Sequence, residues 1–121
     1  VNFANGDMVG HTAIKDAIIL AMEALDAVLG EVVCEAIGAN VSTIITADHG
    51  NVDEINNPET GNPNTQHSLN PVPCIIIDNN NEWKIINEKN AGLSNIAPTL
   101  LTLMGIEKPK EMTSKTLIEK S

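Results

Sequence analysis

Apolar residues recur at steps of three and four through the first third of the 121-residue chain, and this spacing predicts an amphipathic helix. The stripe consists of Ile14, Ile18, Ala21, Leu25, Val28, Val32 and Ala36. Thr12 stands where a helix N-cap is expected, and Gly38 stands where a helix commonly stops. We therefore expect a helix over residues 13–37 whose apolar stripe packs in the core.

Short apolar runs on both sides of this helix indicate strands. Residues 1–4 resemble the end of one strand, and residues 41–46 form a β-branched run without strict alternation, as in a strand covered on both faces. This order of strand, helix and strand predicts a βαβ unit with a parallel strand pair and a right-handed crossover. Further strands are expected at residues 74–77 and 83–86, which makes the predicted class α/β.

Residues 52–70 are poor in apolar side chains and rich in Asn, Pro, Gly and Thr. They predict a loop longer than is usual in compact domains, and such loops are often functional or disordered. Residues 78–82 predict a polar turn of the hairpin type.

The last third of the chain predicts one more helix. It is expected over residues 95–104, with Ser94 as its cap and Pro98 in its first turn, where proline is tolerated. Residues 108–121 are expected to form a polar tail held by Met112, Leu117 and Ile118. Repeats and low-complexity tracts are absent, so residues 1–121 are expected to form a single domain.

The formal net charge of −9 narrows the possible partners. All seven basic residues are lysines, and the chain contains no arginine. Nucleic-acid binding needs a basic patch on the protein, and none is visible, so we expect no nucleic-acid partner. Arginine is also the usual bidentate clamp for phosphate, so the chain alone is poorly equipped to hold a phosphorylated substrate.

The sequence also indicates a cellular setting. Cys34 and Cys74 fall in apolar patterns and are interpreted as buried free thiols, which is typical of a reducing cytoplasm. No apolar run is long enough to span a bilayer, so no membrane partner is expected. The chain opens without an initiator Met on what resembles the tail of a strand, and we interpret it as a fragment.

The candidate chemistry begins with Asp48 and His49, which follow the strand expected at residues 41–46. A carboxylate and an imidazole are both metal ligands, and Gly50 permits the turn that would let them reach one ion or two neighbouring ions.

A second pair, Asp7 and His11, lies four residues apart. On a helix the two side chains would share one face, whereas Gly6 and Gly10 favour a loop; either geometry could offer two ligands to one metal. Taken alone, such a pair is more often a surface salt link or a cap.

The third histidine, His67, lies at the end of the long loop, where it could equally hydrogen-bond within that loop. Ligands in open α/β sheets collect at the carboxyl ends of strands. Both acid and histidine pairs are expected at that edge, which strengthens the metal-site interpretation of each.

Five stretches of the chain resemble, in order, the C-terminal part of the cofactor-independent (2,3-bisphosphoglycerate-independent) phosphoglycerate mutases. They are residues 2–12, 45–51, 65–73, 95–101 and 110–113. This family belongs to the alkaline phosphatase superfamily, and the resemblance implies part of a three-layer α/β sandwich with a mostly parallel sheet and flanking helices.

The resemblance also implies roles for individual residues. Asp7, His11 and His67 match the family's ligands to a first Mn²⁺, and Asp48 and His49 match ligands to a second. The implied reaction, in glycolysis and gluconeogenesis, interconverts 2- and 3-phosphoglycerate through a phosphoserine intermediate. The nucleophilic serine and the substrate-gripping arginines have no counterpart here, so no residue is assigned to catalysis or substrate binding and the isolated chain is expected to be inactive.

Ala13, Asn95 and Ser114 depart from the family pattern without removing a ligand. Two alternatives stay open: a metal-dependent phosphohydrolase of the same superfamily, and a non-catalytic metal-binding α/β module. Zn²⁺ or Co²⁺ would also suit these ligands. The parent enzyme is expected to be a monomer, whereas the fragment could self-associate through an unpaired sheet edge.

Overall fold

A computed structural model describes all residues, 1–121. The chain divides into two compact units. Unit 1 consists of Val1–Glu35 and Thr46–Cys74, and unit 2 consists of Ala36–Ile45 and Ile75–Ser121. Every candidate ligand named above belongs to unit 1, so each unit can be described by itself.

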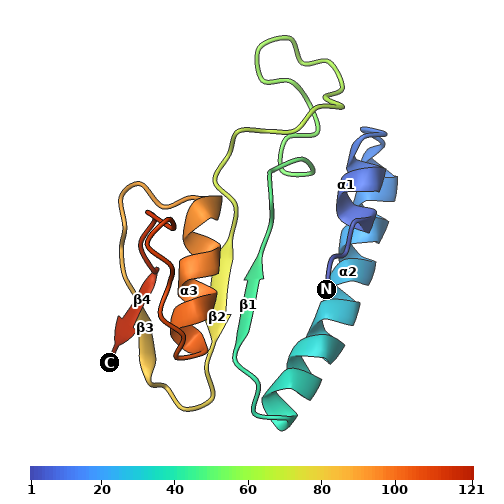
Figure 1. Ribbon diagram of the computed structural model, residues 1–121. Helices are drawn as coiled ribbons and strands as arrows, with labels where there is room; N and C mark the ends of the chain where they lie inside the picture. The colour runs from blue at the N-terminus through green and yellow to red at the C-terminus, as the bar shows by residue number, and fades with distance from the viewer. The chain divides into compact units, whose positions relative to one another are not determined.

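Unit 1 contains helix α1 (Asn5–Gly10) and most of helix α2 (Lys15–Gly38). Figure 1 shows α1 lying beside the start of α2. Between the two helices the Thr12 hydroxyl donates to the Val9 carbonyl at 2.6 Å and accepts from the Ile14 N–H at 3.2 Å. The long helix therefore forms as predicted, two residues later than expected at its start.

The strand expected at residues 1–4 is not formed, and the prediction of a βαβ unit with a parallel pair is wrong. The Ala4 carbonyl accepts from the Met8 N–H at 3.0 Å and so begins α1. A strand requires a ladder of hydrogen bonds to a neighbour, and residues 1–4 form none in this chain.

The stripe of α2 is less buried than its spacing predicts. Ile18 is 3% exposed, but Ile14 and Val28 are 59% and 44% exposed. Spacing identifies a helix face, whereas burial depends on what packs against it. The thiols differ from expectation in the same way, because Cys34 is exposed and Cys74 is only half-buried, although both are free.

Two strand pairs are formed. β1 (Thr43–Thr46) pairs with β2 (Cys74–Ile77), and Figure 1 shows these strands running in opposite directions. β3 (Trp83–Ile85) pairs antiparallel with β4 (Ile118–Lys120). The turn at residues 78–82 therefore does not close a hairpin, and the expected polar tail ends in a strand.

The core of unit 2 lies where β4 meets helix α3 (Ile96–Leu103), which follows the short helix η1 (Leu93–Asn95). Leu117 and Ile118 are 6% and 2% exposed, which confirms that they hold the C-terminal segment. Pro98 lies in the first turn of α3 as predicted.

The cap of α3 differs from the prediction. The N-cap position is Asn95, and the Ser94 hydroxyl instead bonds the Ser114 hydroxyl at 2.8 Å. The Asn95 side chain accepts from the Gly92 N–H at 2.8 Å, so the turn before the helix is held by an amide.

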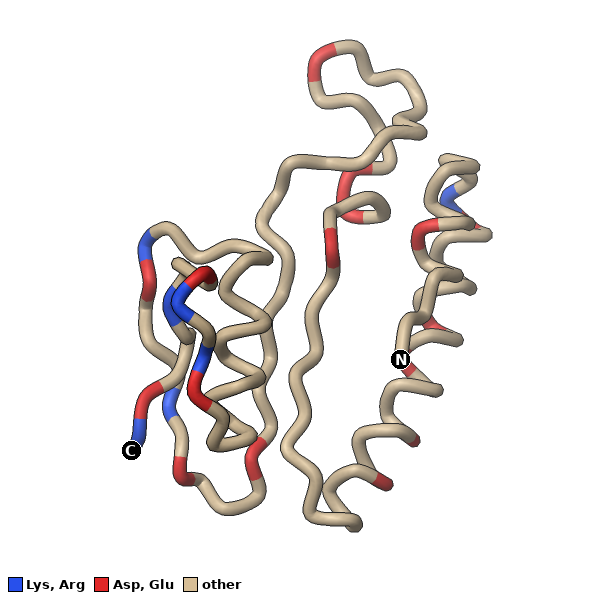
Figure 2. The backbone as a smooth tube through the Cα atoms, viewed as in Figure 1, with Lys and Arg blue, Asp and Glu red and all other residues tan.

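Charge is distributed unevenly between the units (Figure 2). Unit 1 holds ten of the sixteen acidic residues and only one lysine, Lys15, so it carries the whole formal net charge of −9. Unit 2 has equal numbers of acidic and basic residues. None of the helices is both long enough and apolar enough to cross a membrane.

Candidate metal centre

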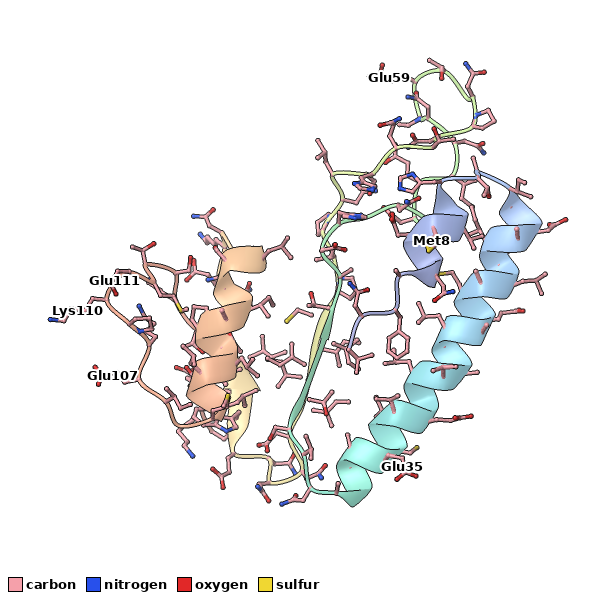
Figure 3. The ribbon with its side chains drawn as sticks, turned by 45° about the vertical axis from the view of Figure 1, so that its right-hand side comes forward. Met8, Glu35, Glu59, Glu107, Lys110 and Glu111 are labelled. Atoms are coloured by element: carbon pink, nitrogen blue, oxygen red, sulfur yellow. The ribbon has the colours of Figure 1, made fainter.

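One carboxylate and three imidazoles converge in unit 1. Asp7 lies on α1 and His11 directly follows it, whereas His49 follows β1 and His67 lies near the end of the long loop. Figure 3 shows α1, on which Met8 is labelled, beside the loop segments that carry the other donors. Asp7 therefore lies within a short helix and His11 is the C-cap residue of that helix, one position beyond its last residue.

Three ligand atoms form a nearly equilateral triangle. Asp7 Oδ1 lies 3.2 Å from His11 Nε2 and 3.3 Å from His67 Nε2, and the two nitrogens are 3.2 Å apart. Donors at about 2.0–2.2 Å from one cation, with angles near tetrahedral, lie about 3.3–3.6 Å from one another. The triangle therefore fits one transition-metal ion within a few tenths of an ångström.

A second pair of donors lies beside the triangle. Asp48 Oδ1 is 3.6 Å from His49 Nε2, and His49 Nε2 is 4.0 Å from Asp7 Oδ1. The Asp48 side chain is 81% exposed. Ligand atoms of Asp7, His49 and His67 also lie within 4.8 Å of one another, so all five expected ligands are brought together, with three donors closely grouped and two on the margin.

Backbone carbonyls orient two of the imidazoles. His11 Nδ1 lies 2.7 Å from the Thr65 carbonyl, and His49 Nδ1 lies 3.3 Å from the Gly50 carbonyl. A carbonyl oxygen only accepts, so in both contacts Nδ1 is the donor, and Nε2 is the ring nitrogen that faces the carboxylates. Metal-binding histidines are commonly oriented by such outer contacts.

Asn51 orients the carboxylate of this centre. Its Nδ2 donates to Asp7 Oδ1 at 2.7 Å, and the Asn51 residue is 8% exposed. This hydrogen bond lowers the pKa of Asp7; partial burial opposes it, and the positive potential of His11, His67 and His49 adds to it. Asp7 is therefore held as a charged carboxylate with its ligand atom aimed at the histidines.

Sequence reasoning missed Asn51 and a second supporting acid, Asp53. The Asp53 carboxylate accepts from Asn70 Nδ2 at 2.7 Å and from Ser68 Oγ at 2.8 Å. The bond from Asn70, and to a smaller extent the one from Ser68, lowers the pKa of Asp53, although burial opposes the shift. The structure also explains Gly10, because a Cβ at that position would collide with the Asn51 side chain.

The comparisons with known proteins agree with this chemistry. Residues 1–108 match the sequence profile described as the metalloenzyme superfamily, and the chain belongs to that superfamily. Curated relatives named 2,3-bisphosphoglycerate-independent phosphoglycerate mutase include one from Rhodopirellula baltica, 48% identical over 98% of this chain and 22% of its own length. Another, from Clostridium acetobutylicum, is 47% identical over 98% of this chain and 23% of its own length.

A solved structure of a phosphoglycerate mutase is similar to this chain in its fold. The chain matches Leishmania mexicana phosphoglycerate mutase, crystallised at low cobalt concentration, with a TM-score of 0.89 and 34% identity. The match covers 99% of this chain and 24% of that protein. It confirms the predicted α/β class, and the chain spans less than a quarter of the proteins it resembles.

Proposed function

We propose that this chain is the C-terminal metal-binding segment of an Mn²⁺-dependent phosphoglycerate mutase. The parent enzyme would interconvert 2- and 3-phosphoglycerate through a phosphoserine intermediate, as the names of the relatives suggest for the overall reaction. The observation that carries the proposal is the triangle of Asp7 Oδ1, His11 Nε2 and His67 Nε2, with sides of 3.2–3.3 Å.

The donor set fits a divalent transition metal. Asp7, His11 and His67 would hold a first cation, and Asp48 with His49 would supply two ligands to a second. Mixed carboxylate and imidazole ligands suit Mn²⁺, and also Zn²⁺ or Co²⁺. A cation bound there would lower the pKa of an attacking hydroxyl and neutralise charge on a transferred phosphoryl group.

The negative charge of this chain favours the binding of metal ions over the binding of a phosphorylated substrate. The acidic excess of unit 1 attracts cations and repels a phosphorylated substrate. Unit 1 has a single lysine, Lys15, and the chain has no arginine. We therefore assign the phosphate-binding groups to segments outside these 121 residues. The family resemblance implies that the nucleophilic serine also lies outside them, so we expect the isolated chain to be inactive. Two free cysteines are in keeping with a cytoplasmic setting.

The test uses a longer protein that contains this chain, assayed with 3-phosphoglycerate for both 2-phosphoglycerate and free phosphate. We expect interconversion without net release of phosphate, lost in Asp7→Asn and kept in Asp26→Asn. Asp26 is an exposed acid on α2 and controls for the removal of one negative charge from unit 1. Release of free phosphate as the main product would favour the phosphohydrolase, and turnover by the isolated chain would refute the assignment of the nucleophile to another segment.

A further inference from the structure

A single antiparallel bridge, Gly50 to Ser68, joins the segment after β1 to the end of the long loop. The Ser68 N–H donates to the Gly50 carbonyl at 2.9 Å. Neighbouring residues of extended backbone point to opposite sides, so His49, Asn51 and His67 share one side of this bridge. The contacts agree, because side chains of all three reach the carboxylate on α1.

The opposite side of the bridge holds a hydrogen-bonded lock. Ser68 is 7% exposed, and its Oγ donates to Asp53 Oδ2 at 2.8 Å. Asn70 Nδ2 donates to the same oxygen at 2.7 Å. A Cβ added at Gly50 would lie 2.8 Å from Asp53 Oδ1 and even closer to Ser68 Oγ, so the lock packs directly on the glycine.

On the side of the bridge that faces the metal centre, two histidine rings are aligned. The rings of His49 and His67 are stacked, with centroids 3.5 Å apart and planes 13° from parallel. Their positions are diagonal across the bridge, which is within reach of large side chains. If the pairing of the two segments slipped by one residue, His67 would point to the other side of the bridge. The backbone hydrogen bonds of one isolated bridge fix this register only weakly.

We propose that Ser68 and Asp53 are positioning residues whose hydrogen bond fixes the register of this bridge and thereby stacks His49 on His67. The role in metal binding rests on the proposed function, whereas the stacking itself does not. Neither residue touches a donor atom of the centre. By holding this stack, the lock sets the distance between His67, assigned to the first proposed cation, and His49, assigned to the second.

The first measurement uses the metal-free, 121-residue chain. Ring-current shifts of the Cδ2–H and Cε1–H resonances of His49 and His67 report the stack by NMR. We expect Ser68→Ala and Asp53→Ala to move these resonances toward the positions of free histidine. Ser68→Thr, which restores the hydroxyl, should keep the wild-type positions, and Asp26→Ala controls for the loss of one acidic charge.

The second measurement is the affinity of the same variants for Mn²⁺. Loss of a direct outer contact to a metal ligand typically weakens binding about 10–100-fold. Ser68 acts one step further away, so we expect a loss of up to about 10-fold for Ser68→Ala, and no loss for Ser68→Thr or Asp26→Ala. If Asp53→Ala fails to fold, as judged by circular dichroism, Asp53→Asn replaces it. That variant keeps one neutral oxygen as acceptor and should shift the resonances by an intermediate amount.

The outcomes separate this inference from the proposed function. Wild-type resonance positions retained in both Ser68→Ala and the Asp53 variant would overturn the lock, whatever the affinity for Mn²⁺. Displaced resonances in a chain whose wild type binds no Mn²⁺ would uphold the lock and refute the metal-binding function. Displaced resonances with unchanged Mn²⁺ affinity would limit the lock to the stack and overturn its role in metal binding.

Discussion

Gly10→Ala is expected to destabilise the chain, although the substitution places alanine in a helix. Gly10 is buried at the end of α1 and is not among the glycines with positive φ, so its backbone would accept alanine. The obstacle is Asn51. An added Cβ would lie 2.7 Å from Asn51 Cγ and 3.0 Å from Nδ2, and closest of all to Oδ1.

The sizes of two opposing effects decide whether Gly10→Ala stabilises or destabilises the chain. Alanine gains at most about 1 kcal/mol over glycine in a helix interior, and less at a helix end. Overpacking a well-filled site costs about 1–3 kcal/mol, and here the atoms that must move belong to a residue only 8% exposed. The shift would also break the 2.7 Å bond from Asn51 to Asp7 and leave the carboxylate free to turn away from the histidines.

Urea unfolding tests this with a matched control. Nothing lies within 4 Å of a Cβ added at Gly30, inside α2, so Gly30→Ala should stabilise the chain by about 1 kcal/mol. In an Asn51→Ala background the cost of Gly10→Ala should largely disappear, since the obstacle is gone. Stabilisation of the wild-type chain by Gly10→Ala to the same extent as by Gly30→Ala would refute the steric reasoning.

Three further predictions concern stability. Thr99 is fully buried and its Oγ1 accepts from the Leu117 N–H at 2.8 Å, so Thr99→Val should cost about 1–3 kcal/mol in urea unfolding, and more than the half-buried Thr102→Val. Ile118→Ala, at a side chain 2% exposed, should cost about 2–5 kcal/mol by the same measurement, and a loss near zero would show that β4 is not part of the core. The pKa of Asp53 lies below its ordinary 3.8, so the charged carboxylate stabilises the folded chain. This contribution is complete above the unfolded pKa and is lost as pH falls through the folded pKa. The stability difference between wild type and Asp53→Asn should therefore shrink below about pH 4, and a difference independent of pH would contradict this.

Regular elements could be predicted where the sequence carries its own boundary signals. β2 begins directly after Pro73 and has the predicted bounds, and α2 ends at Gly38 within one residue of the prediction. Residues 1–4 show the limit of this reasoning, because an apolar run becomes a strand only when another strand pairs with it. β4 was missed for the converse reason, since its partner β3 lies over thirty residues away and no local pattern connects them.

The metal-donor residues of the candidate site could be predicted from the sequence, but the residues that orient them by hydrogen bonds could not. Asp7, His11 and His49 carry their chemistry in their residue types and follow short-range spacing rules. Asn51 and Asp53 act across loops, and no spacing rule relates Asn51 to a carboxylate 44 residues away. Only the folded loop shows which amide and which hydroxyl support each donor.

The most direct test of the central claim is a Mn²⁺ titration of the 121-residue chain, followed by electron paramagnetic resonance. We expect one tighter site that is lost in His67→Ala and one weaker site that is lost in Asp48→Ala, because the first has three convergent donors and the second has two. Two sites of equal affinity, or binding that survives Asp7→Ala unchanged, would contradict the account.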